Sequence, residues 1–344
     1  MSYPLPKLSS AVLLLLCLLL PLTALSAIAS GAVTLSPAAI LAGIASWWLD
    51  EPSQAGVIIM QIRLPRVLLA ALVGAILASS GAAMQGLFRN PLADPSLIGV
   101  TAGASLGASI AIVAAGAAVQ GFSAITLVSA GAFAGGLLAV IVVYRLASSG
   151  NTTSVATMLL AGIAITALAG AIGNLLEFYA DSEVLRRISL WRMGGLDGAD
   201  PQRLMFAAIV CLLVLGALPL FSGRLNALLL GESEARYLGI DVERTKAVLV
   251  VIVAIGVGAA VALAGTIAFV GLVVPHIIRM IIGPDHRTLI PASALAGASL
   301  LMGADMVARV VLAPTELPVG IVTALIGVPF FISLLRHRSH YGMQ

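Results

Sequence analysis

The run Ala247–Gly265, AVLVVIVAIGVGAAVALAG, contains no charged residue and decides which kind of fold this chain can adopt. A helix needs about 20 consecutive apolar residues to cross the hydrocarbon core of a bilayer, and this run has that length. The strands of a membrane barrel would alternate polar and apolar residues, which this run does not do. Because a helix satisfies all its backbone hydrogen bonds internally, the run predicts a membrane-spanning helix.

Similar runs recur along the whole chain, in which 60% of the 344 residues are hydrophobic and 10% are charged. Soluble domains average about 25% charged residues, so this chain cannot cover a water-facing surface. We therefore predict an all-α membrane protein, one transmembrane domain over 1–344, in contact with lipid and not with nucleic acid. About ten spans are predicted, at 9–29, 64–88, 97–118, 122–145, 155–177, 203–221, 247–265, 267–282, 288–307 and 317–335.

The first span could be a cleaved signal peptide, because Lys7 precedes an apolar stretch and small residues lie near Ala27. The apolar stretch continues to Ala29, which favours a retained first helix. With the N-terminus in the cytoplasm, eleven of the 18 Lys and Arg residues fall inside and seven outside. The positive-inside rule favours this orientation, with both termini cytoplasmic. All seven outside are arginines.

Two polar insertions interrupt the spans. Residues 30–62 are predicted to form a periplasmic loop with a short interfacial helix near Trp47 and Trp48, and residues 222–246 a cytoplasmic segment. A weak inverted repeat is predicted from Gly81–Pro91 and Gly265–Pro275, which share one Gly-to-Pro spacing and lie five spans apart. Chance matches of common Gly, Ala and Pro are the alternative explanation of the repeat.

Glycines four residues apart predict close helix contacts, since helices in lipid associate through backbone approach. They form two faces, Gly99, Gly103 and Gly107 in one span and Gly131 and Gly135 in the next.

No predicted span carries an Asp, Glu, Lys or Arg near its centre. Transporters driven by ion gradients need such groups, which makes a secondary transporter the weaker alternative. The chain also has no phosphate-binding loop, so ATP would be used by a separate subunit and no cofactor would be bound here. The four histidines show no metal-ligand spacing, and no catalytic constellation indicates an enzyme or a metal site.

Several motifs, in order from residue 62 to the C-terminus, carry a family resemblance. They are Ile62–Arg66 (IRLPR), Gly81–Gly86 (GAAMQG), Arg89–Pro95 (RNPLADP), Phe269–His276 (FVGLVVPH), Gly303–Arg309 (GADMVAR) and Glu316–Gly320 (ELPVG). The chain resembles the FecCD-type permeases, the membrane subunits of haem, ferric-siderophore and cobalamin ABC importers. The resemblance implies ten helices as in cobalamin-importer permeases, a homodimer with the pathway between its subunits, two ATPase subunits inside, a periplasmic binding protein outside, and a bacterial inner membrane.

By this resemblance, Arg63, Arg66 and Arg309 receive acidic residues of the binding protein. The planar guanidinium suits paired hydrogen bonds to a carboxylate. The alternative is that these arginines only reach lipid headgroups at the membrane interface.

The resemblance also assigns a cytoplasmic coupling segment within 222–246, made of two short helices joined at Gly231. Its residues are Leu228, Leu229, Gly231, Glu232, Ala235, Leu238 and Gly239, and its leucines would enter a groove of the ATPase. The alternative is a plain polar loop.

Two further assignments concern the pathway. Asn90, Pro91 and Leu92 would close its inner mouth, although they could form only a turn. The fifth span would line it, with Thr157, Thr166 and Asn174 as polar points.

For the substrate, Leu160–Gly170 and the stretch from Ala180 to Trp191 resemble haem permeases more than cobalamin permeases. Ferric siderophore and cobalamin are the alternatives.

Overall fold

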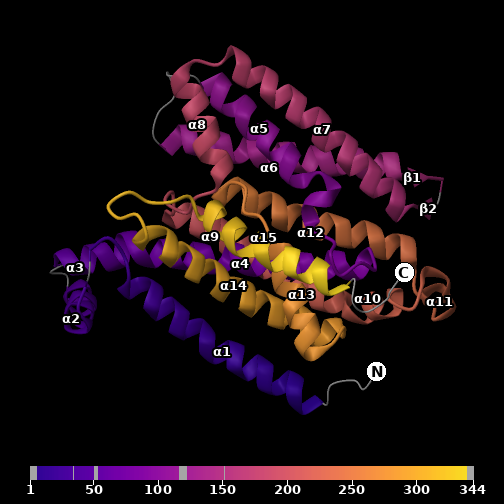
Figure 1. The fold of residues 1–344 in the computed structure, drawn as a ribbon, viewed down its shortest axis with the longest axis horizontal. Helices are drawn as coiled ribbons and strands as arrows, with labels where there is room; N and C mark the ends of the chain where they lie inside the picture. The colour runs from indigo at the N-terminus through magenta and orange to yellow at the C-terminus, as the bar shows by residue number, and fades with distance from the viewer. Residues whose placement is uncertain (1–5, 34, 50–52, 116–121, 151, 339–344) are drawn as a thin grey trace.

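The computed structural model describes residues 6–33, 35–49, 53–115, 122–150 and 152–338. Both chain ends, which are predicted to be cytoplasmic, lie outside these ranges. The described chain is helical apart from one two-stranded hairpin (Figure 1). The elements are α1 (Pro6–Ala29), α2 (Pro37–Trp48), α3 (Gln54–Val57), the π-helical turn η1 (Ile58–Arg63), α4 (Leu64–Leu87), η2 (Pro95–Ile98), α5 (Val100–Ala115), α6 (Phe122–Ala147), β1 (Ser148–Ser149), β2 (Thr152–Thr153), α7 (Val155–Tyr179), α8 (Ser182–Met193), α9 (Pro201–Ala217), η3 (Leu218–Phe221), α10 (Ser222–Leu228), α11 (Glu232–Tyr237), α12 (Val242–Ala264), α13 (Val270–Ile282), α14 (His286–Val310) and α15 (Val319–Arg338).

Each predicted span overlaps a helix within the described residues, while 116–118 of the third predicted span lie outside them. The all-α class is confirmed. Within the described ranges, seven stretches are long and apolar enough to cross a membrane. The helices α5, α13 and α15 fall short of that length over their described residues. The count of ten spans therefore stays a prediction.

The centre of the bundle is built on α4, which is buried along most of its length and packs against α14, α13, α12 and α9. Glycines permit these approaches: a Cβ on Gly74 would overlap the Gly297 carbonyl of α14, and one on Gly81 would overlap the Gly271 carbonyl of α13. The glycine faces lie at close helix contacts, as predicted, and the structure shows that they meet each other, since Gly107 of α5 lies directly against Gly131 of α6.

The first helix packs against α14, with Ala27 fully buried. Its retention stays a prediction. The predicted external loop contains the short helix α2, whose Trp48 is exposed. A continuous helical stretch leads from Gln54 through η1 into α4, so the second span begins well before the predicted residue 64. The side chain of Ser53 starts it by accepting a hydrogen bond from the Gly56 amide.

The two sequence repeats do not adopt the same local structure. Pro91 follows the end of α4, whereas Pro275 lies inside α13. Their shared Gly-to-Pro spacing therefore does not mark equivalent helix ends.

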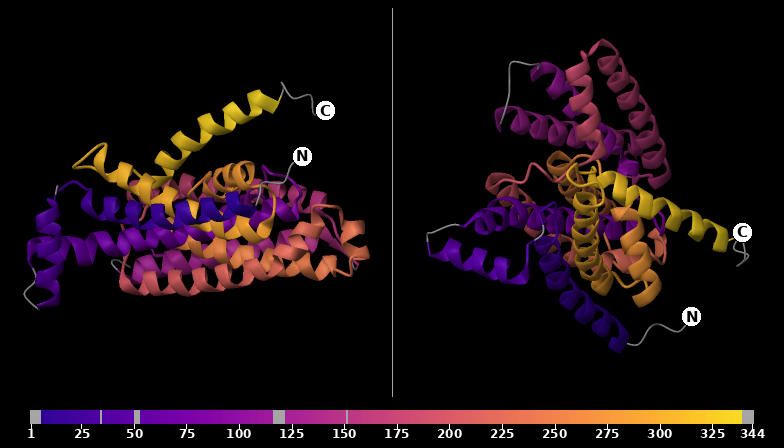
Figure 2. Two further views of the ribbon diagram at one scale, coloured as in Figure 1. Left: turned by 90° about the horizontal axis from the view of Figure 1, so that it is seen from below. Right: turned by 60° about the vertical axis from the view of Figure 1, so that its left-hand side comes forward.

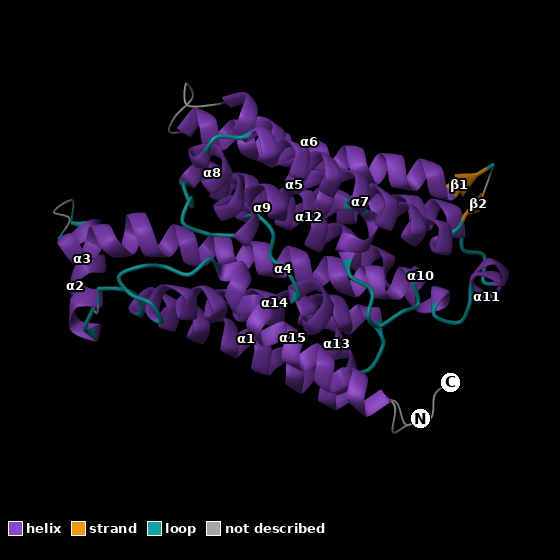
Figure 3. Cartoon of the chain, turned by 45° about the horizontal axis from the view of Figure 1, so that its top comes forward, coloured by secondary structure: helices purple, strands orange, loops and turns teal. Residues whose placement is uncertain are grey.

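The predicted cytoplasmic segment and the predicted external loop lie at opposite ends of the bundle. In Figure 1, α10, α11 and the β1–β2 hairpin lie at one end, together with the start of α1, and α2 and α3 lie at the opposite end. Figure 2 shows α15 leaning away from the rest of the bundle, and Figure 3 shows the hairpin at the same end as α11.

Candidate functional site

A buried ion cluster lies where α4 and α14 approach the end of α1. The Asp305 carboxylate forms ion pairs with Arg66 Nε at 2.9 Å and with Arg309 Nε at 3.0 Å. Arg66 Nη1 also donates to Glu316 Oε2 at 2.6 Å. Asp305 is completely buried, so its charge is stabilised by the two guanidinium groups rather than by water.

The same cluster holds the end of α1. Arg63 Nη1 donates to the carbonyls of Ile28 and Ala29, both at 2.8 Å, and Arg309 Nη2 donates to the Ala27 carbonyl at 3.0 Å. The last carbonyls of a helix have no partner within the helix, and cations stabilise that end. Two of the predicted docking arginines therefore cap α1 within their own chain.

The structure places Arg63, Arg66 and Arg309 in one region, but each is buried and has partners in this chain, and their docking role stays a prediction. The acidic partners, Asp305 and Glu316, were not predicted. The position of Asp305 four residues before Arg309 on one helix was the available signal, because residues at that spacing are neighbours on a helix. The side chain of Glu316 is the exposed member of the cluster, at 43%.

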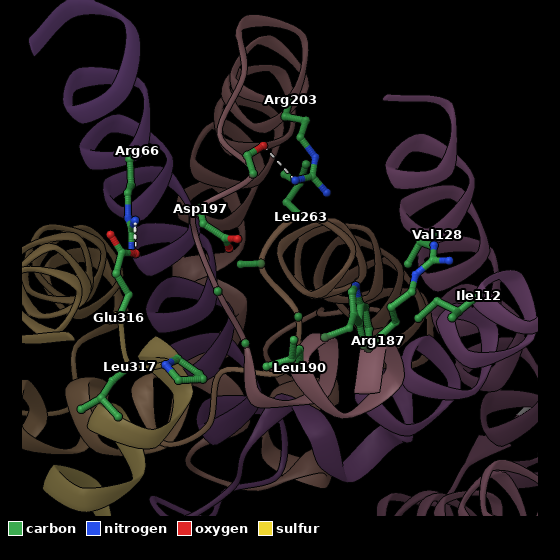
Figure 4. A pocket seen from close by; sticks show the side chains of 17 residues that line it. Arg66, Ile112, Val128, Arg187, Leu190, Asp197, Arg203, Leu263, Glu316 and Leu317 are labelled. Atoms are coloured by element: carbon green, nitrogen blue, oxygen red, sulfur yellow. Dashed lines mark hydrogen bonds and ion pairs between the residues drawn. The ribbon is translucent and has the colours of Figure 1, made fainter. Parts of the chain in front are cut away.

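A cavity of about 470 Å³ opens beside this cluster (Figure 4). Arg66 and Glu316 line one side, and Arg187 of α8 and Arg203 of α9 line the other. Arg203 donates to the Gly198 carbonyl and to Ser129 Oγ, both at 2.9 Å. The cavity is lined by three of the seven arginines predicted to lie outside, Arg66, Arg187 and Arg203, and could receive an anionic group.

At the opposite end, the predicted pair of short helices is present as α10 and α11, meeting at Gly231, whose φ of 134° suits glycine. Leu228 is 1% exposed and Ala235 is fully buried, so both support the segment from within this chain and cannot enter a partner's groove. The exposed apolar side chains of the segment are Leu230, Tyr237 and Leu238. Leu229 and Glu232 are half-buried, and Gly239 has a φ of 81° at the end of α11.

Polar contacts fix α10 to the start of α14. Asn226 Oδ1 lies 2.8 Å from His286 Nδ1, and Asn226 Nδ2 donates to Asp285 Oδ1 at 2.6 Å. His286 is fully buried. The contact between Asn226 and His286 was not predicted, because the sequence around a histidine in a turn does not indicate which side chain it contacts.

The predicted gate residues form a turn after α4. Asn90 Oδ1 accepts a hydrogen bond from the Leu92 amide at 3.0 Å, and the Pro91 carbonyl lies 3.2 Å from His276 Nδ1 of α13. Further along, Asp94 caps η2 by accepting from the Ser96 amide. Burial raises the pKa of the Asp94 carboxyl above its ordinary value despite this hydrogen bond.

A groove of about 730 Å³ runs between α5 and α7. Three hydroxyl residues spaced by four on α5, Thr101, Ser105 and Ser109, line it together with Thr166 of α7. Glu177 and Arg192, an ion pair at 2.6 Å, lie at the same groove. Of the predicted pathway residues only Thr166 lines this groove, while Thr157 and Asn174 are exposed elsewhere on α7.

The model of the FecCD transport family matches residues 15–337. The chain belongs to the FecCD transport family. The resemblance seen in the sequence motifs is thereby confirmed.

Two relatives show how similar members of this family are. The chain is 46% identical over 283 residues to a hemin transport system permease protein of Yersinia pestis, covering 81% of this chain and 84% of the relative. It is 43% identical over 303 residues to a cobalamin import system permease protein of Halobacterium salinarum, covering 88% and 80%.

A solved structure shares the fold. It is an inward-facing conformation of a metal-chelate-type ABC transporter, 32% identical, with a TM-score of 0.82 over 95% of this chain and 99% of that one. This chain is therefore a multi-pass membrane protein and a permease subunit of an ABC importer, a class in which a separate subunit carries the ATPase.

Proposed function

We propose that this permease moves a metal chelate from the periplasm to the cytoplasm, with haem as the first candidate. The relative named as a hemin permease is 46% identical to this chain, and this similarity carries the proposal. Cobalamin is the second candidate, because other relatives of 43% and 42% identity are named as cobalamin or vitamin B12 permeases. A ferric siderophore is the third.

The groove between α5 and α7 suits a bulky chelate. Its hydroxyl and apolar side chains can contact a large planar ligand, and its charged residues Glu177 and Arg192 are paired with each other. Such weak contacts suit a pathway that must release its cargo again. Thr157 and Asn174 would line the pathway only once a second subunit faces α7.

The transporter would be a homodimer in a bacterial inner membrane, with both termini in the cytoplasm. Two ATPase subunits would bind at the end that carries α10 and α11 and would use the ATP. A periplasmic binding protein would dock at the end that carries Arg66. This chain would bind no cofactor of its own.

Within that assembly, the exposed Leu230, Tyr237 and Leu238 would contact the ATPase, while buried Leu228 and Ala235 hold the segment in shape. Asn90, Pro91 and Leu92 would close the inner mouth. Arg66 would form an ion pair with an acidic residue of the binding protein, which would replace the exposed Glu316 as its partner.

Reconstitution tests this function. Proteoliposomes containing the permease and its ATPase, with the binding protein outside, should take up haem when ATP is supplied within. Uptake should be unaffected by a proton gradient. ATP-driven uptake of cyanocobalamin but not haem would transfer the assignment to cobalamin, and uptake by the permease alone under a pH gradient would refute the ABC-importer function.

A further inference from the structure

A lysine lies buried beneath the coupling segment. Lys246, in the first turns of α12, is only 1% exposed. Its Nζ donates to Glu232 Oε2 of α11 at 2.8 Å and to the Thr153 carbonyl of β2 at 2.8 Å. One buried cation therefore joins three segments that are separate in the chain.

Glu243, also on α12, completes the connection. Its Oε2 accepts a hydrogen bond from the Thr153 amide at 2.8 Å, and its Oε1 lies 3.4 Å from Lys246 Nζ. Charged side chains therefore hold both the N–H and the C=O of Thr153. Hydrogen bonds to charged groups are stronger than neutral ones, and burial strengthens them further.

Thr153 stands directly before the pathway helix. The next residue, Ser154, caps α7 by accepting a hydrogen bond from the Thr157 amide at 3.2 Å. A movement of α11 must therefore either break the contacts of Lys246 or carry the start of α7 along. Breaking the contact with Glu232 would leave the buried ammonium with only the more distant Glu243 carboxylate, which is unfavourable.

We propose that Lys246 is the positioning residue that makes the start of α7 follow the coupling segment, through Glu232 on one side and Thr153 on the other. This inference rests on the proposed function, since it assigns the route by which movement at the ATPase contact reaches the pathway helix. Lys246 touches neither ATP nor the transported chelate.

The test replaces Lys246 by methionine, which fits the buried space without charge, in the complete transporter with its ATPase and binding protein. Transport of whichever of haem or cyanocobalamin the wild type carries should fall by about tenfold or more per ATP hydrolysed, because a charge-assisted link is lost. ATP hydrolysis itself should continue. Thr152→Val, in the same hairpin but outside the Lys246 contacts, should transport as the wild type does.

Hydrogen exchange separates coupling from mere structural support. In the wild type, trapping the ATPase with ATP and vanadate should change the exchange of the amides around Thr153. In Lys246→Met that change should disappear. Equal transport per ATP in wild type and Lys246→Met, or an unchanged nucleotide-dependent exchange at Thr153, would overturn the proposal.

A second variant tests the proposal if Lys246→Met does not assemble. Lys246→Met combined with Glu232→Gln removes both charges, so that no buried ion is left without its partner. This double variant should assemble and transport poorly per ATP, and normal coupling in it would also overturn the inference. If the wild type shows no ATP-driven uptake of either probe, the proposed function fails instead.

Discussion

The Arg66 guanidinium on α4 lies 2.9 Å from the Asp305 carboxylate on α14, joining two helices that approach through Gly74 and Gly297. The same carboxylate binds Arg309, which caps α1. Asp305 therefore connects three helices at the end of the bundle where the binding protein is proposed to dock. The fold and the proposed docking therefore share the same few side chains there.

Replacing Asp305 by Asn should destabilise the permease, because Arg66 and Arg309 then lose the carboxylate that pairs with both. Breaking a buried ion pair costs about 3–5 kcal/mol. Thermal unfolding in detergent should show a clearly lower midpoint. The control is Glu316→Gln, whose half-exposed side chain predicts a loss below about 1 kcal/mol. Equal midpoints for Asp305→Asn and wild type would contradict the structural role of this carboxylate.

Substitutions of Glu316 and Arg66 should change the affinity for the binding protein in opposite directions. Glu316→Gln removes the internal carboxylate that competes for Arg66, so an acidic binding-protein residue should bind more tightly, and Arg66→Gln should weaken binding. Charge-assisted hydrogen bonds contribute about 1.5–3 kcal/mol, which predicts changes in affinity of about tenfold to a hundredfold. Titration of the purified binding protein at low and high salt measures both effects, and identical affinities in all three proteins would return Arg66 to a purely structural role.

The exposed apolar side chains in and beside α11 should contact the ATPase. Leu238→Asp places a charge where an apolar groove is expected, at a cost of a few kcal/mol, and should abolish stimulation of the ATPase while the permease stays folded. Leu228→Asp should instead prevent folding, since that side chain is buried in this chain. Ser233→Ala is the control within α11. Normal ATPase stimulation in Leu238→Asp would place the contact elsewhere.

Two glycines give a matched test of helix packing. A methyl group on Gly107 would overlap the Gly131 carbonyl, whereas one on Gly216 in α9 would meet no atom within 4 Å. Gly107→Ala should therefore lower stability by about 1–3 kcal/mol, the usual cost of overpacking. Gly216→Ala should be neutral or slightly stabilising, because alanine favours the helix. Size-exclusion profiles after graded heating report both, and equal losses would show that the α5–α6 approach tolerates a side chain.

The coupling segment shows how far sequence patterns reach. The glycine at 231 and the surrounding leucines predict two short helices, which are present. The pattern does not predict that Leu228 faces inward while Leu238 faces outward, because both are leucines in a polar segment. Only the position of α10 against α14 and α4 decides which leucine is buried.

The sequence by itself determines that this chain is a bundle of membrane helices, because lipid offers the backbone no hydrogen bonds and apolar runs of that length can only be helical. It also determines the glycine faces, since close approach in lipid requires small residues. Tertiary structure alone decides which charges pair across separate segments. Arg66 meets Asp305, and Lys246 meets Glu232 and Thr153, across segments whose neighbours are set by helix packing. A buried charge takes whichever partner the packed helices bring within reach, and no local pattern encodes that partner.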